Sequence, residues 1–144
     1  MAMIFFRILF ITLLIISGSV NAQQEILGKW KTVDDNTGEP RSIVEIYKKG
    51  EKVYGKIERI LKESERGKRC IECEGDNYNE PIEGMVIIKE LEKDGEEYED
   101  GTILDPENGK VYRCKIWVDK ENPRILNVRG YIAFLYRTQK WIRI

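Results

Sequence analysis

The residues with the most obvious chemistry in this sequence are its three cysteines, Cys70, Cys73 and Cys114. A Cys-x-x-Cys pair can form a redox-active disulfide or supply two ligands to a structural zinc ion. The chain has no histidine, which removes Ser–His and Cys–His catalysis and every histidine metal site. Structural zinc usually takes four cysteine or histidine ligands. We therefore predict a structural disulfide between Cys70 and Cys73, with no metal site and no cofactor.

Two other interpretations of the cysteines stay open at this stage. The Cys70–Cys73 pairing leaves Cys114 as a free thiol buried on the apolar face of its strand, whereas in the alternative Cys114 pairs with either early cysteine and ties a loop to a strand. A thiol-redox enzyme would use Cys70 and Cys73, with Arg69 favouring the thiolate. In thioredoxin-like proteins, however, such a pair begins a helix in a βαβ unit, whereas here it lies in a polar loop. We therefore favour a protein that is not an enzyme.

Glu45 is the carboxylate that raises the question of ligand binding. It stands between Ile43 and Tyr47 in an alternating strand pattern. If that face points into the core, Glu45 is a buried charge that needs a partner such as Arg129. If the opposite face points inward, Glu45 lies on the surface, which is the usual place for glutamate. We take no residue as catalytic, and our candidate ligand-binding residues are Glu45, Tyr47, Tyr112, Arg129 and Tyr131.

The elements that position these residues are short strands. Segments rich in Val, Ile and Tyr recur between Gly, Asn, Asp and Pro turn signals. We expect strands over residues 26–33, 41–47, 52–61, 85–91, 97–104, 110–118, 125–131 and 138–144, with 64–69 and 132–136 as alternative short helices. Many short antiparallel strands bury their apolar faces by forming a sandwich or a closed barrel. The sequence therefore predicts an all-β protein, and eight strands in a barrel leave room for one small ligand.

The first 22 residues carry one charge, Arg7, within an otherwise apolar run that ends in small residues. This pattern is typical of a secretory signal peptide. We expect a signal peptide over residues 1–22 and a single domain over 23–144, in a protein that is periplasmic or secreted. Membrane contact would come only through an uncleaved first segment.

The charge balance excludes one class of partner. Lys and Arg number 24 and Asp and Glu number 25, which gives a net charge of −1. Nucleic-acid-binding proteins usually carry a basic surface, so we expect no nucleic acid. The remaining candidate partners are a small apolar or amphipathic ligand and another protein of the cell envelope.

An ordered set of motifs runs through the chain. They are Gly28-Lys29-Trp30, Thr37-Gly38, residues 42–47, Tyr54-Gly55-Lys56-Ile57, Cys70-x-x-Cys73, residues 101–106 with Asn108-Gly109, Tyr112-x-Cys114, residues 128–131, and Arg137-Thr138 with Trp141-x-Arg143. Together they resemble the exported bacterial family catalogued as domain of unknown function 2147. The resemblance implies a small antiparallel, closed or nearly closed β-barrel of about eight strands, calycin-like and lipocalin-like. It implies no activity. Tyr136 stands where this family pattern has a glycine.

The resemblance also implies structural roles. Gly28-x-Trp30 looks like the opening motif of lipocalins, in which the tryptophan closes one barrel end beneath an arginine from near the C-terminus. Arg137 or Arg143 could be that arginine. The other structural residues of the motifs are Asp105, Pro106, Gly109 and Trp141.

The function most consistent with such a barrel is binding of a small apolar or amphipathic ligand in the cell envelope. The alternative is a packed barrel that interacts with an envelope protein and holds no ligand, and it predicts an exposed apolar patch.

Overall fold

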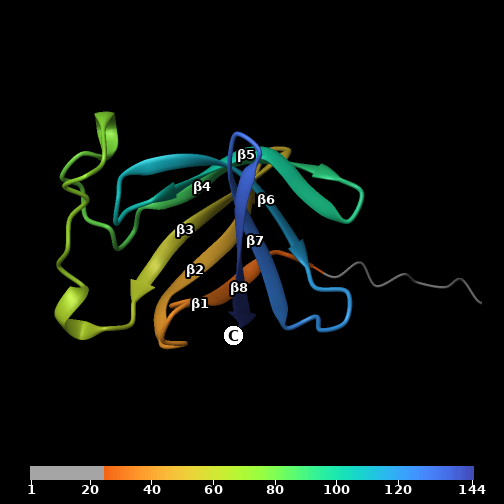
Figure 1. Cartoon of the computed structure of the whole chain (residues 1–144), viewed down its shortest axis with the longest axis horizontal. Coiled ribbons are helices and arrows are strands. Elements are labelled where there is room, and N and C mark those ends of the chain that lie inside the picture. The colour runs from red at the N-terminus through yellow and green to blue at the C-terminus, as the bar shows by residue number, and fades with distance from the viewer. Residues whose placement is uncertain (1–24) are drawn as a thin grey trace, which may run out of the picture.

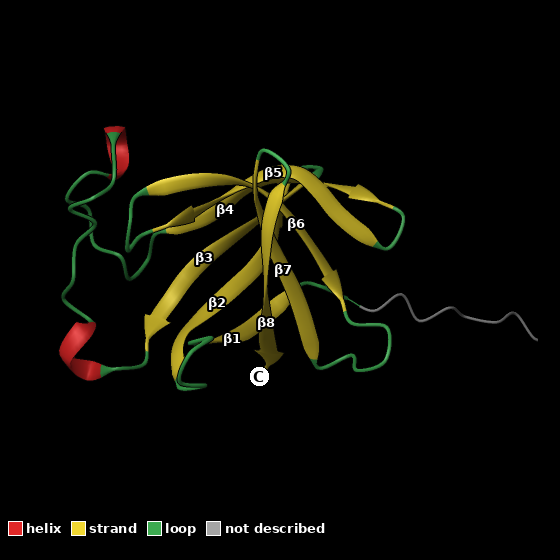
Figure 2. Ribbon diagram, viewed as in Figure 1, coloured by secondary structure: helices red, strands yellow, loops and turns green. Residues whose placement is uncertain are grey.

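Eight antiparallel strands close into a barrel in sequence order (Figure 1, Figure 2). The computed structural model describes residues 25–144, so the predicted signal peptide, residues 1–22, lies outside the described residues. The strands are β1 (Gly28–Val33), β2 (Pro40–Lys49), β3 (Lys52–Ile60), β4 (Val86–Asp94), β5 (Glu97–Asp105), β6 (Lys110–Val118), β7 (Ile125–Ile132) and β8 (Leu135–Arg143). The prediction of an all-β, closed, eight-stranded barrel is confirmed.

The barrel closes where the first strand meets the last. Trp30 and Lys31 of β1 pair with Arg143 and Ile142 of β8. Closure removes the unpaired edges that would otherwise invite association with another sheet.

Within residues 25–144, no helix has the length and apolar character needed to cross a bilayer.

Alternation along each strand decides which side chains fill the interior. On β6, Cys114, Ile116 and Val118 are buried, whereas Arg113, which precedes Cys114, is exposed. This is the one-sided burial that the alternating sequence predicted. Across the barrel, the fully buried side chains are Ile26, Trp30, Val44, Ile46, Val53, Cys70, Ile88, Leu91, Ile116, Leu126 and Trp141.

The two ends of the barrel receive different connections. Because neighbouring strands are antiparallel, successive turns alternate between the ends. Residues 34–39, 61–85, 106–109 and 133–134 connect strands at one end, which we call the open end. Residues 50–51, 95–96 and 119–124 connect strands at the other end, where β1 begins and β8 finishes. The long 61–85 connection, green in Figure 1, stands out beside the barrel.

The structure corrects the expected extent of the last strand. β8 begins at Leu135 rather than at residue 138, because Leu135 pairs with Ile132 and Tyr136 pairs with Tyr131. Residues 132–136 therefore form a hairpin turn and no helix, and Ala133 takes the positive φ of 51° that the turn requires. Within 64–69 only a single 3-10 turn forms, η1 (Glu63–Glu65), and a second, η2 (Gly75–Asn77), follows in the same connection.

Candidate functional site

The end of the barrel opposite the open end is closed by Trp30. Its side chain is 0% exposed and its Nε1 donates a hydrogen bond to the Ile26 carbonyl at 2.8 Å. The Arg143 guanidinium carbon lies 4.1 Å from the centre of an indole ring of Trp30. Arg143 also donates hydrogen bonds to the carbonyls of Leu27 and Glu25. Of the two arginines that the motif left open, Arg143 therefore covers the tryptophan, and the fully buried indole fills this end of the interior.

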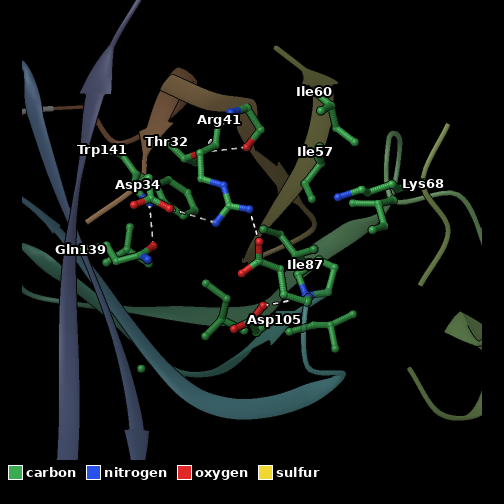
Figure 3. Close-up of a pocket in the computed structure, with 18 of the residues that line it drawn as sticks. Thr32, Asp34, Arg41, Ile57, Ile60, Lys68, Ile87, Asp105, Gln139 and Trp141 are labelled. Carbon is green, nitrogen blue, oxygen red and sulfur yellow. Dashed lines mark hydrogen bonds and ion pairs between the residues drawn. The ribbon is translucent and has the colours of Figure 1, made fainter. Parts of the chain in front are cut away.

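The open end contains a cavity of about 860 Å³ (Figure 3). Its apolar wall comes from seven strands and from the 61–85 connection, which places a large hydrophobic surface beside charged side chains. Gly130 also lines it, and a Cβ at this position would meet the Cβ of Tyr112 at 3.4 Å. The apolar lining residues are Val33, Ile57, Ile60, Ile71, Ile82, Ile87, Ile103, Leu104, Pro106, Tyr112, Val128 and Trp141.

Arg41 crosses the mouth of this cavity. Figure 3 shows its guanidinium in the middle of the opening, between Asp34 and the turn that follows Asp105. Its Nη1 lies 3.5 Å from Asp34 Oδ2, and its Nη2 donates to the Glu107 carboxylate. The hydrogen bond to Glu107 raises the pKa of Arg41 above its usual value. β2 and the β5–β6 turn lie on opposite sides of an eight-stranded barrel, so this ion pair spans the opening.

The β1–β2 turn holds Asp34 in position for that contact. The backbone N–H groups of Thr37 and Asn36 donate to Asp34 Oδ1 at 3.0 and 2.9 Å. These two bonds stabilise the carboxylate, so the pKa of Asp34 falls below its usual value.

A second polar chain connects the same turn to the cavity wall. Arg137 of β8 donates to Asp35 Oδ2, and Gln139 Nε2 lies 3.3 Å from the same oxygen. The Gln139 side-chain carbonyl in turn accepts from Trp141 Nε1 at 3.2 Å. Trp141 is thus a wall residue whose indole N–H is satisfied inside the barrel, and Arg137 is a residue of the cavity rim.

The disulfide shapes the third side of the cavity. Cys70 and Cys73 are joined, with their Cα atoms 5.3 Å apart, and the Cys70 sulfur lies 3.4 Å from the Pro106 carbonyl oxygen. The connection packs so closely on the β5–β6 turn that a Cβ on Gly109 would lie 1.8 Å from the Glu72 carbonyl oxygen. Only glycine fits there. The predicted disulfide pairing is therefore present, and it shapes the connection that lines the cavity.

Asp105 and Cys114 have structural roles. Asp105 Oδ1 accepts the backbone N–H of Glu107 at 2.9 Å and so closes its own turn. Cys114 is a free thiol, 2% exposed, and burial raises its pKa to about 12. The disulfide sulfurs are equally enclosed, since Cys70 is 0% and Cys73 3% exposed. A reactive thiol needs solvent access and a lowered pKa, so this arrangement does not suit thiol-redox chemistry.

Metal ligands do not gather in the part of the chain that the structure describes. Over residues 25–144, no three cysteine, aspartate or glutamate side chains come close enough together to hold a metal ion.

The five candidate ligand-binding residues are not brought together. Tyr112 lines the cavity. Glu45 and Tyr47 lie on the outer face of β2, because Val44 and Ile46 are the residues that point inward. Their surroundings are other surface groups, and Tyr47 stacks on Tyr54 with ring centres 5.9 Å apart. We therefore remove Glu45 and Tyr47 from the candidate site.

Arg129 and Tyr131 also lie outside the barrel, since Val128 and Gly130 are the inward residues of β7. The Arg129 guanidinium carbon sits 4.2 Å from the ring centre of Tyr136, and its Nε donates to Thr138 Oγ1 at 2.7 Å. These contacts satisfy Arg129 on the surface, so it and Tyr131 leave the candidate site as well.

The sequence analysis missed the residues that actually form the mouth, above all Arg41 and Glu107. They are 66 positions apart, and each looks like an ordinary surface charge beside a turn. A usable signal was present in the pattern, because turns of alternate hairpins meet at the same end of an antiparallel barrel. Combining the β1–β2 turn with the β5–β6 turn would have placed these two charges at one opening.

Comparisons with known proteins agree with this architecture. A family model named DUF2147, described as an uncharacterised protein conserved in bacteria, matches residues 28–143. A solved structure described as protein HP1028 from Helicobacter pylori, belonging to the lipocalin family, superposes with a TM-score of 0.71. The two chains are 19% identical over 83% of each, so the likeness shows a shared fold. A comparison with curated protein sequences found no match.

Proposed function

This chain belongs to the family DUF2147, a group of uncharacterised proteins conserved in bacteria, and we propose that it binds one small amphipathic molecule at the open end of its barrel. The observation that carries the proposal is the cavity of about 860 Å³ with an apolar wall and a charged rim. Ligand sites in proteins are typically clefts of ~300–1,000 Å³ with mostly apolar linings and a few polar groups.

The chemistry of the walls describes the ligand. An apolar tail or ring system would lie among Ile57, Ile103 and Val128, away from water. A polar head would stay at the rim, where Arg41 and Glu107 offer a donor and an acceptor beside one another. The ligand class that fits is therefore a single-chain amphiphile or a compact apolar molecule with one polar end.

We place this binding in the cell envelope. The apolar first segment of the sequence supports export. The buried Cys70–Cys73 disulfide supports it too, because disulfides persist mainly in oxidising compartments.

A packed barrel without a ligand is the alternative function, and one observation favours part of it. The exposed apolar patch that this alternative requires is present at the β7–β8 hairpin, where Phe134 is exposed. The same alternative requires a filled interior, which the cavity does not provide. We therefore treat the hairpin as a second surface of a ligand-binding protein.

Titration with the neutral apolar fluorophore N-phenyl-1-naphthylamine tests the proposal, using two adjacent substitutions on β5. Ile103 faces the cavity, so Ile103→Trp fills part of it. Thr102 pairs with the exposed Arg113 and faces outward, so Thr102→Trp adds the same side chain to the surface and serves as the matched control.

We expect the wild type and Thr102→Trp to bind the fluorophore with one saturable site. Ile103→Trp should bind it at least about tenfold more weakly, because the indole occupies volume that the probe needs. Equal affinities in all three proteins would show that the probe binds elsewhere and would remove the support for a site in the cavity.

A further inference from the structure

The β7–β8 hairpin presents the most exposed apolar surface in the described chain. Phe134 is 88% exposed, and Ile132, Leu135 and Tyr136 beside it are all more than half exposed. We call residues 132–136 the hairpin tip. Soluble proteins rarely leave several neighbouring large apolar side chains in water unless that surface meets a partner or a membrane.

The barrel wall that carries this tip has a single sign of charge. β6, β7 and β8 contain no Asp or Glu, although the whole chain is nearly neutral. The basic residues of these strands are Lys110, Arg113, Lys115, Arg129, Arg137, Lys140 and Arg143. By contrast, β5 alone carries Glu97, Glu99, Asp100 and Asp105. What distinguishes these three strands is the absence of acidic residues of their own. Lys115 and Arg137 form ion pairs with Glu97 and Asp35, and Arg143 covers Trp30. The cations left to meet a negatively charged surface are Lys110, Arg113, Arg129 and Lys140.

Aromatic rings at the base of the tip and along its strands lie against the cations. The Arg113 guanidinium lies 5.7 Å from the ring centre of Tyr131, and that of Arg129 lies 4.2 Å from Tyr136 and 4.9 Å from Trp117. Tyrosine, tryptophan and arginine in this order are typical of residues at the boundary between lipid headgroups and acyl chains. From the tip backwards, the apolar residues are therefore followed by Tyr131 and Tyr136 beside Arg113, and then by Arg129.

We infer that the hairpin tip docks on an anionic lipid surface, with Phe134 and Leu135 in the acyl boundary and the basic wall against the headgroups. The charge complementarity of an acid-free wall with anionic lipid favours this occupant over a neutral one. A hairpin tip is also convex, and a bilayer accepts a convex apolar projection without a preformed pocket.

Docking in this way would bring the cavity to the membrane. The hairpin belongs to the open end, and Gly130 and Arg137 on its two strands line the cavity. This part of the inference rests on the proposed function, since it makes the bilayer the place where an amphipathic ligand enters or leaves the barrel. The docking itself does not depend on the cavity, so the two can be tested separately.

Flotation with lipid vesicles tests the docking. The protein would begin at Gln23, because every strand of the closed barrel lies between Gly28 and Arg143, and circular dichroism would confirm that each variant is folded. One set of vesicles contains phosphatidylethanolamine with anionic phosphatidylglycerol, and the other contains phosphatidylcholine alone. Binding should be strong only to the anionic vesicles and should weaken as salt is raised.

Three variants separate the contributions to binding. Phe134→Ser with Leu135→Ser should weaken binding to anionic vesicles by about tenfold or more, since two exposed apolar side chains no longer enter the bilayer. Arg113→Gln with Lys140→Gln should weaken it by about fivefold for each cation removed. Ile144→Ser is the control, because it removes an exposed aliphatic side chain from the opposite end of the barrel and should leave binding unchanged.

Several results would overturn the inference. One is an absence of vesicle binding by the wild type, and another is equal binding to both kinds of vesicle. A third is self-association that the Phe134→Ser and Leu135→Ser changes abolish, which would make the tip an interface with a second copy of the chain. Fluorophore titration of the same variant distinguishes the two proposals. If the variant loses vesicle binding but keeps its affinity for the fluorophore, the docking and the cavity are separate and the cavity proposal stands. If the wild type binds anionic vesicles but does not bind the fluorophore, the docking stands and the cavity proposal fails.

Discussion

The two ends of this barrel use an arginine in opposite ways. At the closed end, Arg143 lies over Trp30 and donates to backbone carbonyls, so the indole is fully covered. At the open end, Arg41 is held by Asp34 and Glu107 over a cavity of about 860 Å³. The first arrangement buries the Trp30 ring completely. The second leaves the apolar wall of the cavity uncovered beneath the ion pairs of Arg41. We expect stability to be concentrated at one end and the proposed ligand binding at the other.

Truncating the closed end should have the largest effect. Trp30→Ala removes a fully buried indole together with its hydrogen bond to Ile26. We expect the free energy of unfolding to fall by about 3–5 kcal/mol, as for other large-to-small core changes. Urea unfolding followed by circular dichroism measures this. A loss below about 1 kcal/mol would mean that the closed end does not carry the stability assigned to it.

Removing the disulfide should have the next largest effect, at the open end. Cys70→Ser with Cys73→Ser opens a ring with a sequence separation of 3. The chain-entropy model gives about 2 kcal/mol for so short a loop. The 61–85 connection should also become more sensitive to protease, because the ring no longer positions it against Pro106. Limited proteolysis of both proteins checks this, and identical cleavage rates would contradict the role given to the disulfide.

The two C-terminal arginines provide a direct comparison of the ends. Arg143→Gln loses the contact with the Trp30 ring and two hydrogen bonds, and should cost about 1–2 kcal/mol. Arg137→Gln loses an ion pair on a side chain that is 67% exposed, and should cost less than about 1 kcal/mol. Urea midpoints of the two variants decide the order. Equal losses would show that the ends are not energetically distinct.

The smallest effect should appear in the pH dependence of stability. The pKa of Asp34 is lowered in the folded protein by hydrogen bonds from Thr37 and Asn36. A lowered pKa means that the folded state binds this proton less readily than the unfolded state. The resulting stabilisation is present above pH 3.8 and is lost as the pH falls from there through the folded pKa.

Asp34→Asn isolates that contribution, since its amide oxygen can still accept the two backbone bonds. Its urea midpoint should decline less steeply below pH 3.8 than that of the wild type. Parallel pH profiles of the two proteins would show that Asp34 is not the source of the difference.

The strands could be predicted from the sequence because their signals are local, whereas the choice of a closed barrel over a sandwich came from the family resemblance. Turn residues and alternating apolar positions marked each strand, and the Cys70–Cys73 pairing followed from cysteine usage. The inward-facing side of β2 and of β7 could not be predicted, since an alternating sequence shows two faces without showing which one points into the barrel. Glu45 and Arg129 were therefore placed in the candidate site although Val44 and Val128 point inward.

The rim could not be predicted for a different reason. Arg41 reaches Glu107 across the mouth only because the barrel closes, and closure depends on all eight strands together. The hairpin tip was missed because residues 132–136 suggested an apolar turn of helix. The pairing of Tyr131 with Tyr136 instead projects Phe134 into water.

Native mass spectrometry after incubation with a single-chain lysophospholipid tests the central claim most directly, because it counts bound molecules. We predict one retained lipid on the wild type and on Thr102→Trp, and none or a small fraction on Ile103→Trp. The same lipid occupancy on Ile103→Trp, or no retained lipid on any of the three folded proteins, would contradict a binding site in the cavity at the open end.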